Sequence, residues 1–364
     1  MKKIFLLFLL FLPLGLSAQS TQQEEIFKAK VIEILAEKEI IDESGLNFIQ
    51  QNLRLKGLSG NFKNQEIVFE GISDFQILSS RQYALGDRVM VISSINDDGS
   101  SYFFVSDYDR TNPIILLSFI FIFSVLVIGR WKGFRSLLAL IASFLVILKF
   151  IIPQILAGTN PVLVSVLGGI FILFFAIYLT QGFNIKAHLA NLSLIISLLF
   201  TAFLSAMFTA LAQLSGYAGE ETVFLFDLAQ GSLNLQGLLL AGILIGTLGV
   251  LDDVIISQVS TVEQIKQANP SLSKKEVYKM SAKVGVDHIT SMINTLFFAY
   301  AGAALPLLIL FAKSDVIGLN LSQAINNEMV ATEIIRTLLG SIGIILAIPI
   351  SNWLASWFLS AKKA

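Results

Sequence analysis

The stretch 242–258, GILIGTLGVLDDVIISQ, is apolar enough to lie in a lipid bilayer, yet it contains two adjacent carboxylates, Asp252 and Asp253. On a helix with 3.6 residues per turn, Asp252 points roughly 100° away from Asp253. The face that includes Asp253 carries Gly242, Gly246, Gly249, Asp253 and Ser257. Small residues allow close helix packing. A carboxylate within a bilayer costs at least about 2.5–3.5 kcal/mol, so it normally faces protein or water and has a function. The stretch therefore predicts a helix-packing face next to a proton or cation site.

Other polar side chains fall near the same side of the membrane. Asp287 and His288 open a later apolar segment, and His188 opens an earlier one. Asn294 lies on a polar face of the later segment, and we expect this face to pack against the glycine face. The other members of the polar face, which Phe298 interrupts, are Ser291, Thr295 and Gly302. Carboxylates and imidazoles suit proton relay or cation coordination. Asp287 and His288 can equally lie among the headgroups, where an acid also caps a helix N-terminus.

The depth of each charge limits which groups can pair. At 1.5 Å per residue, Asp252 and Asp253 lie about 9 Å from the inner end of their helix, and Lys149 lies about 21 Å from the inner end of its own. A direct contact between Lys149 and Asp253 is therefore not expected, and Lys149 can extend towards the membrane surface instead. Arg336 is expected to meet Glu220 or Glu221 at the outer face. No metal site and no cofactor are predicted.

Composition places the chain among membrane proteins with several spans. Its 364 residues are 55% hydrophobic and 14% charged, with a mean hydropathy of +0.75. The net charge of −1 gives no indication of a nucleic-acid partner. The absence of cysteine excludes disulfides and thiolate chemistry. There is no phosphate-binding glycine loop and no HExxH, and the two adjacent aspartates do not match the two-helix arrangement of intramembrane aspartyl proteases. We therefore do not expect an enzyme.

The N-terminal part predicts a signal and a small β domain. Residues 1–18 combine Lys2 and Lys3 with an apolar core, which indicates a secretory signal peptide, or an uncleaved first helix. Residues 20–110 are polar and contain the strand-like runs QEIVFEGI, DRVMVISSI and SSYFFVSDY. Five or six such strands predict a β-rich extracytoplasmic domain, OB-like in form. This domain either caps the membrane part or binds an extracytoplasmic partner.

Residues 113–360 predict an α-helical polytopic membrane domain. Apolar windows mark about seven transmembrane helices, at 114–130, 135–156, 161–180, 188–214, 236–258, 288–312 and 334–358. With the β domain outside, the inner segments hold Arg130, Lys132, Arg135, Lys186, Lys266, Lys274, Lys275, Lys279, Lys283, Lys362 and Lys363. This bias predicts a plasma-membrane protein whose C-terminus is cytoplasmic.

The cytoplasmic loop 259–286 is expected to contain a helix of its own. Asn269-Pro270 interrupts the preceding helix, and Ser273 with Glu276 resembles a capping box. The helix that follows, KKEVYKMSAKV, is basic and amphipathic. It either lies on anionic lipid headgroups, or the segment 259–285 docks a cytoplasmic partner.

Four blocks of the sequence together resemble the YibE/F family of bacterial multi-pass membrane proteins, over roughly residues 60–357. They are YLTQGFNIKAHLA (178–190), GTLGVLDDVIISQVSTVEQIKQANP (246–270), DHITSMINTLFFAYAGAALPLLILF (287–311) and IIRTLLGSIGIILAIP (334–349). Related sequences often have an arginine before the Asp-His pair, where this chain has Val286, so a charge cluster there is not required. The resemblance implies a multi-pass fold with an extracytoplasmic N-terminal portion and no agreed activity.

These observations favour a transport-related protein, a proton- or cation-coupled permease in which Asp253 titrates and the polar face around Asn294 lines the path. Two alternatives stay open. One is a non-transporting accessory or signalling protein, in which the β domain binds an external partner and 259–285 reports inward. The other is a permease subunit of a larger transporter that docks an ATPase. The oligomeric state is not predicted.

Overall fold

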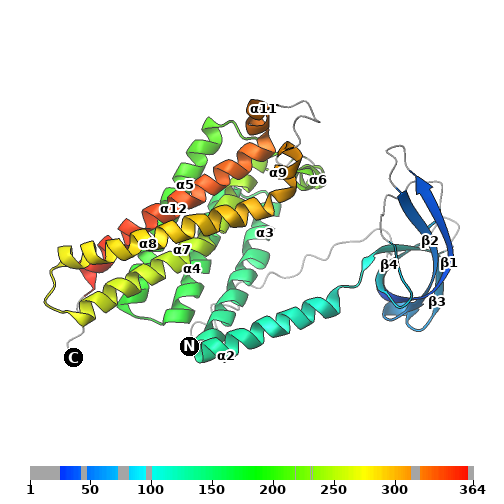
Figure 1. Ribbon diagram of the computed structural model, residues 1–364, viewed down its shortest axis with the longest axis horizontal. Helices are drawn as coiled ribbons and strands as arrows, with labels where there is room; N and C mark the ends of the chain where they lie inside the picture. Colours follow the sequence, from blue (N-terminus) through cyan, green and yellow to red (C-terminus); the bar gives the residue numbers. More distant parts are fainter. Residues whose placement is uncertain are drawn as a thin grey trace. The chain divides into compact units, whose positions relative to one another are not determined.

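The computed structural model describes residues 25–41, 47–72, 82–95, 101–217, 219–229, 231, 233–312 and 320–359. The described residues form two compact units, a small β domain and a helical bundle, with the division at residue 125 (Figure 1). The expected signal peptide, residues 1–18, lies outside the described residues.

The β domain is one antiparallel sheet in the order β3-β2-β1-β4-β5. Its strands are β1 (Glu25–Ile41), β2 (Asn47–Gly57), β3 (Glu66–Glu70), β4 (Arg88–Ile95) and β5 (Ser101–Tyr108), and the short helix η1 (Gly60–Phe62) follows β2. The three strand-like runs in the sequence correspond to β3, β4 and β5, so these predictions are confirmed.

The sheet bends into a half-barrel because β1 is long and irregular. Its pairing with β2 shifts register between Val31 and Glu33 and again between Ile34 and Ala36, and such bulges bend a strand. One face of the sheet is buried: Phe27 is 1% exposed, whereas its neighbour Ile26 is 61% exposed. The bend brings the two edge strands together, and Phe69 of β3 meets Phe104 of β5 edge to face with ring centroids 6.2 Å apart.

The remaining elements are helices, and the first of them begins in the unit that contains the β domain. They are α2 (Thr111–Val146), the π-helical turn η2 (Ile147–Ile151), α3 (Ile152–Leu156), α4 (Pro161–Gln181), α5 (Ile185–Leu211), α6 (Glu220–Leu228), α7 (Leu235–Ala268), α8 (Lys274–Ala303), α9 (Leu305–Ala312), α11 (Leu321–Asn326) and α12 (Glu328–Phe358). Among the described residues, five helical stretches are long and apolar enough to cross a membrane: Thr111–Leu156, α4, α5, α7 and α12.

The first apolar stretch is interrupted at Arg130, whose φ of 50° and ψ of −130° are not helical. The interruption separates two helical segments, in the same place as the gap between the predicted spans 114–130 and 135–156. The predicted spans at 161–180, 188–214, 236–258 and 334–358 correspond to α4, α5, α7 and α12.

Asparagines start four of the long helices. The side chains of Asn160, Asn184, Asn234 and Asn327 accept hydrogen bonds from backbone N–H groups in the first turns of α4, α5, α7 and α12. An N-cap of this type satisfies donors that a helix cannot pair internally. The same residue type therefore fixes the starting point of each of these helices.

Helix α7 is the centre of the bundle, because it packs against α4, α5, α8 and α12 (Figure 1). Its fully buried side chains include Leu244, Leu251, Val254 and Ile255. They join side chains of α4, α5 and α12 in one apolar core.

The segment around residue 285 differs from the prediction. The predicted break between a surface helix at 274–284 and a span at 288–312 is wrong, because α8 runs without interruption from Lys274 to Ala303. Ser273 and Glu276 do form the predicted capping box, but no helix breaker follows until Pro306, and the chain leaves α8 at Ala304. The basic residues therefore extend the axis of α8. Helix α7 likewise continues to Ala268, so most of the expected loop 259–286 is a helical hairpin.

A partly buried ion pair joins β1 to the end of the β domain. Lys28 Nζ lies 3.0 Å from Asp109 Oδ1, and the Asp109 side chain is 1% exposed. The pKa of Asp109 is lowered, chiefly by a hydrogen bond from the Thr111 hydroxyl, with smaller contributions from Lys28 and the Thr111 backbone N–H.

We predict that Asp109→Asn destabilises this junction by about 1 kcal/mol or more, because it removes the charge that these donors satisfy. Since the folded-state pKa is lowered, the stabilisation is present above about pH 4 and is lost as pH falls through the folded-state value. Hydrogen exchange at pH 7 should accelerate for the amides around Lys28 and Thr111. Glu66→Gln, at an exposed position on β3, is the matched control. Equal exchange in the two variants would contradict the prediction.

Candidate functional site

Asp252 and Asp253 lie near the middle of α7 and have different surroundings. Asp253 is exposed, whereas Asp252 is half-buried. The Asp252 Oδ1 atom is covered by neighbouring atoms and has no hydrogen-bond partner among the described residues. A covered carboxylate oxygen requires a proton, a cation or a donor to offset its desolvation. Asp252 is therefore the candidate for a titrating or cation-binding group.

The predicted glycine face of α7 exists, but it points away from the rest of the bundle. Gly242, Gly246, Gly249, Asp253 and Ser257 are all exposed. A Cβ atom built on Gly242 or Gly249 would meet no atom within 4 Å, and one built on Gly246 would lie 3.1 Å from the hydroxyl of Tyr300. Tyr300 is thus the one α8 residue found beside these three glycines among the described residues.

The polar face of α8 is exposed as well, so the expected packing of the two faces is wrong. Asp287, Asn294, Ser291 and Thr295 are exposed and His288 is half-buried. Helix α8 instead approaches α7 through Gly285, where a Cβ would lie 3.3 Å from Gln258 Nε2 and 2.6 Å from Ile348 Cγ2. Sequence spacing identified residues that share a face, but it did not identify which face contacts a neighbour.

Three further polar residues have identifiable surroundings. His188 Nδ1 lies 2.7 Å from the hydroxyl of Tyr178, so this imidazole is engaged at the start of α5. Lys149 lies in the π-helical turn η2 and is exposed. Arg336 pairs with Glu333 on its own helix at 3.1 Å rather than with Glu221. The side chain of Glu220 lies outside the described residues.

Sequence analysis missed a buried polar contact that joins three helices. Gln258 of α7 is 1% exposed and Asn352 of α12 is fully buried. Gln258 Nε2 donates to Asn352 Oδ1 and to the backbone oxygen of Ser281 in α8, both at 2.7 Å. The partners lie 94 residues apart in the chain, so no local pattern reveals the contact.

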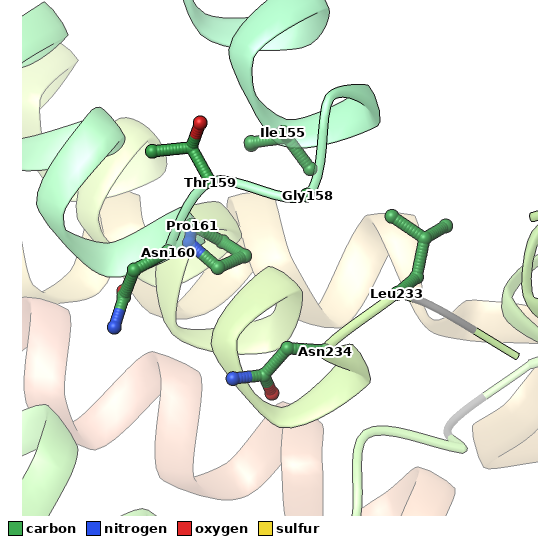
Figure 2. Close-up of a pocket in the computed structure, with 7 residues that line it drawn as sticks. All are labelled: Ile155, Gly158, Thr159, Asn160, Pro161, Leu233 and Asn234. Atoms are coloured by element: carbon green, nitrogen blue, oxygen red, sulfur yellow. The ribbon is translucent and has the colours of Figure 1, made fainter.

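The structure also contains a pocket of about 220 Å³ between the end of α3 and the starts of α4 and α7 (Figure 2). Asn160 and Asn234 line it, but their carbonyl oxygens already cap α4 and α7. None of the residues that line the pocket is titratable. The pocket therefore does not supply acid–base chemistry.

The candidate residues do not assemble into a metal centre. Among the described residues, no group of three or more His, Asp or Glu side chains is close enough to hold a metal ion. The chemistry available on α7 is that of one covered carboxylate with a second carboxylate beside it.

Comparison with protein families identifies a family that covers most of the helical part of the chain. The family described as YibE/F-like protein matches residues 117–361, which include all the long apolar helices from α4 onwards. No curated protein and no solved structure matches the chain.

We predict that Gln258→Met weakens the bundle, because it leaves Asn352 Oδ1 and the Ser281 carbonyl buried without their donor. Polar contacts between membrane helices contribute about 0.6–2 kcal/mol, so the midpoint of thermal unfolding in detergent should fall. Gln264→Met, at an exposed position of the same helix, should leave it unchanged. Equal midpoints for the two variants would show that the contact contributes nothing to stability.

Proposed function

The chain belongs to the YibE/F-like family, and on that premise we propose that it is a transport-related membrane protein, a proton- or cation-coupled permease. One observation carries the proposal: the covered Asp252 Oδ1 has no hydrogen-bond partner among the described residues. A carboxylate placed within an apolar helix is normally functional. Binding of a proton or a monovalent cation to Asp252 would offset the free-energy cost of burying an oxygen that has no hydrogen-bond partner.

Asp252 and Asp253 have different roles in the proposed function. Asp252 is the group that binds the coupling ion, because its surroundings disfavour a bare charge. Asp253, exposed on the glycine face, raises the local negative potential and attracts a cation to the site. The sequence alone favoured Asp253 as the titrating group, and the burial of Asp252 Oδ1 is the reason for preferring its neighbour.

The proposed placement is the bacterial plasma membrane, with the β domain outside and the end of the bundle that carries Lys186 and Lys274 in the cytoplasm. The distribution of lysine and arginine supports this orientation.

A second candidate function has its own support. The strand order β3-β2-β1-β4-β5, with β3 beside β5, is the order of an OB-like barrel, a fold whose surface often binds ligands. The α7–α8 hairpin presents Lys274, Lys275, Lys279 and Lys283 as exposed side chains. These features suit an accessory or signalling protein that binds one partner through the β domain and another through the hairpin.

We predict that Asp252→Asn abolishes proton- or cation-driven flux in liposomes while the variant inserts and unfolds like the wild type. Asp253→Asn should reduce the flux without abolishing it, because it removes an attracting charge and keeps the binding group. Asp227→Asn, at an exposed position of α6, is the control. The measurement follows internal pH and K⁺ or Na⁺ under imposed gradients.

Two results would count against a permease. One is an Asp252→Asn variant that retains wild-type flux. The other is a phenotype that depends on charge reversal at Lys274 and Lys275 and not on Asp252, which would favour the accessory or signalling function.

A further inference from the structure

Helix α8 carries a stripe of polar side chains on the side that faces away from the bundle. The stripe consists of Lys283, Asp287, Thr290 and Asn294, and all four side chains are exposed. At 100° per residue they lie between about 140° and 200° from Gly285, the residue through which α8 approaches α7 and α12. Their spacing of four, three and four residues keeps them on one side of the helix. We call these four residues the outer stripe of α8.

The outer stripe lies beside helices that can cross a membrane. A Cβ built on Gly285 would meet Ile348 of α12, and one built on Gly340 of α12 would lie 3.2 Å from Leu296 of α8. Asn294 falls between these two contacts. The length of α12 between residues 340 and 348 is the middle of a helix that is long and apolar enough to span the bilayer. Asn294 therefore lies at the depth of the hydrocarbon core.

Apolar side chains border the outer stripe on both sides. Val286 and Phe297 lie on one side of it and Val284 and Phe298 on the other, and they are between 47% and 70% exposed. Side chains of this kind suit lipid. A narrow polar stripe between two apolar borders fits one helix of a partner better than it fits open water.

The outer stripe has few partners within the chain. The Thr290 hydroxyl donates to the backbone oxygen of Val286 and is satisfied. Among the described residues, the Asn294 amide makes no hydrogen bond, and neither Lys283 nor Asp287 forms an ion pair. Lipid offers no donor or acceptor. The Asn294 amide therefore requires a partner from another protein molecule.

A second copy of the chain supplies that partner for the amide. Two copies in one membrane have the same orientation, so a two-fold axis along the membrane normal places α8 beside α8 in parallel, with equal residues at equal depth. Asn294 then meets Asn294 of the second copy. A carboxamide both donates and accepts, so the two amides can hydrogen-bond to each other. A single asparagine of this kind fixes the register of paired helices.

The charges of the outer stripe are complementary in the same arrangement. Lys283 and Asp287 lie about 6 Å apart along the helix axis. The four-carbon stem of Lys283 in each copy can span this distance to Asp287 of the other copy. The two acids and two bases together carry no net charge, so the contact requires no further ion.

We propose that this protein forms a dimer in which the outer stripe of α8 packs against the same stripe of a second copy. The spacing of four, three and four residues is that of a coiled-coil seam, which keeps two helices in contact along their length. The proposal concerns assembly, goes beyond the proposed function and depends neither on transport nor on Asp252.

The first test measures the dimer fraction of singly labelled protein in liposomes as the lipid-to-protein ratio rises, by counting photobleaching steps. Asn294→Leu replaces the amide with a side chain that suits lipid, and it should raise the dissociation constant of the dimer about 3- to 30-fold. Thr295→Val is the control, because Thr295 lies about 100° from Asn294 and its hydroxyl donates to its own helix.

Two results of this test would overturn the proposal. One is a wild type that is monomeric at every lipid ratio, which would leave the outer stripe to a different protein. The other is an Asn294→Leu variant that dimerises as tightly as the wild type.

The second test exchanges the charges. Lys283→Asp leaves only acids at these two positions, and Asp287→Lys leaves only bases. Each variant alone should dimerise more weakly than the wild type, and an equal mixture of the two should form mixed dimers in preference to either homodimer. Lys274→Asp, an exposed position on the opposite side of α8, should dimerise like the wild type. A mixture without preference for mixed dimers would overturn the pairing of the two stripes.

The third test locates the contact by cross-linking. The chain has no cysteine, so Thr290→Cys introduces one thiol in the outer stripe and keeps Asn294. Oxidation in the membrane should join two copies through this thiol, whereas Thr295→Cys should stay monomeric. Equal cross-linking at the two positions, or none at Thr290, would contradict the proposed interface.

Discussion

The bundle depends on one constraint: a polar group within a membrane must find its partner inside the protein, because lipid offers none. Gln258 meets this constraint by donating to Asn352 and to the Ser281 carbonyl, which holds α7, α8 and α12 together. Gly285 makes the contact feasible, since a side chain there would collide with Ile348. The central position of α7 thus follows from a polar contact as well as from its apolar core.

The proposed function rests on a place where this constraint is not met. Among the described residues of the bundle, the buried side-chain atoms without a hydrogen-bond partner include Asp252 Oδ1 of α7, Ser165 Oγ of α4 and the hydroxyl oxygens of Ser197, Ser205 and Thr209 of α5. A carboxylate can bind a proton or a cation, whereas a hydroxyl in a helix can be satisfied by the carbonyl one turn earlier, as Ser193 and Thr201 are. Asp252 is therefore the group to which we assign binding of the coupling ion in the proposed function.

Local patterns predicted the elements of the fold well. The alternating residues of β4, the capping box of Ser273 and Glu276 and the glycine face of α7 were all apparent from spacing. The direction in which a face points was not, because it depends on helices far away in the chain. The burial of the hydroxyls from Ser193 to Thr209 could not be predicted either, because it depends on the same distant helices. The continuity of α8 through Gly285 went unpredicted because the composition changes there from basic to apolar. This change suggested a boundary between a surface helix and a membrane span, although no proline separates them.

The central claim is that Asp252 takes up a proton within the bundle. Infrared difference spectroscopy of the reconstituted protein, recorded as pH is lowered, tests it most directly. The account predicts an absorption band of a protonated carboxylic acid that disappears in Asp252→Asn and persists in Asp253→Asn. A spectrum that is identical in the wild type and in Asp252→Asn would contradict it.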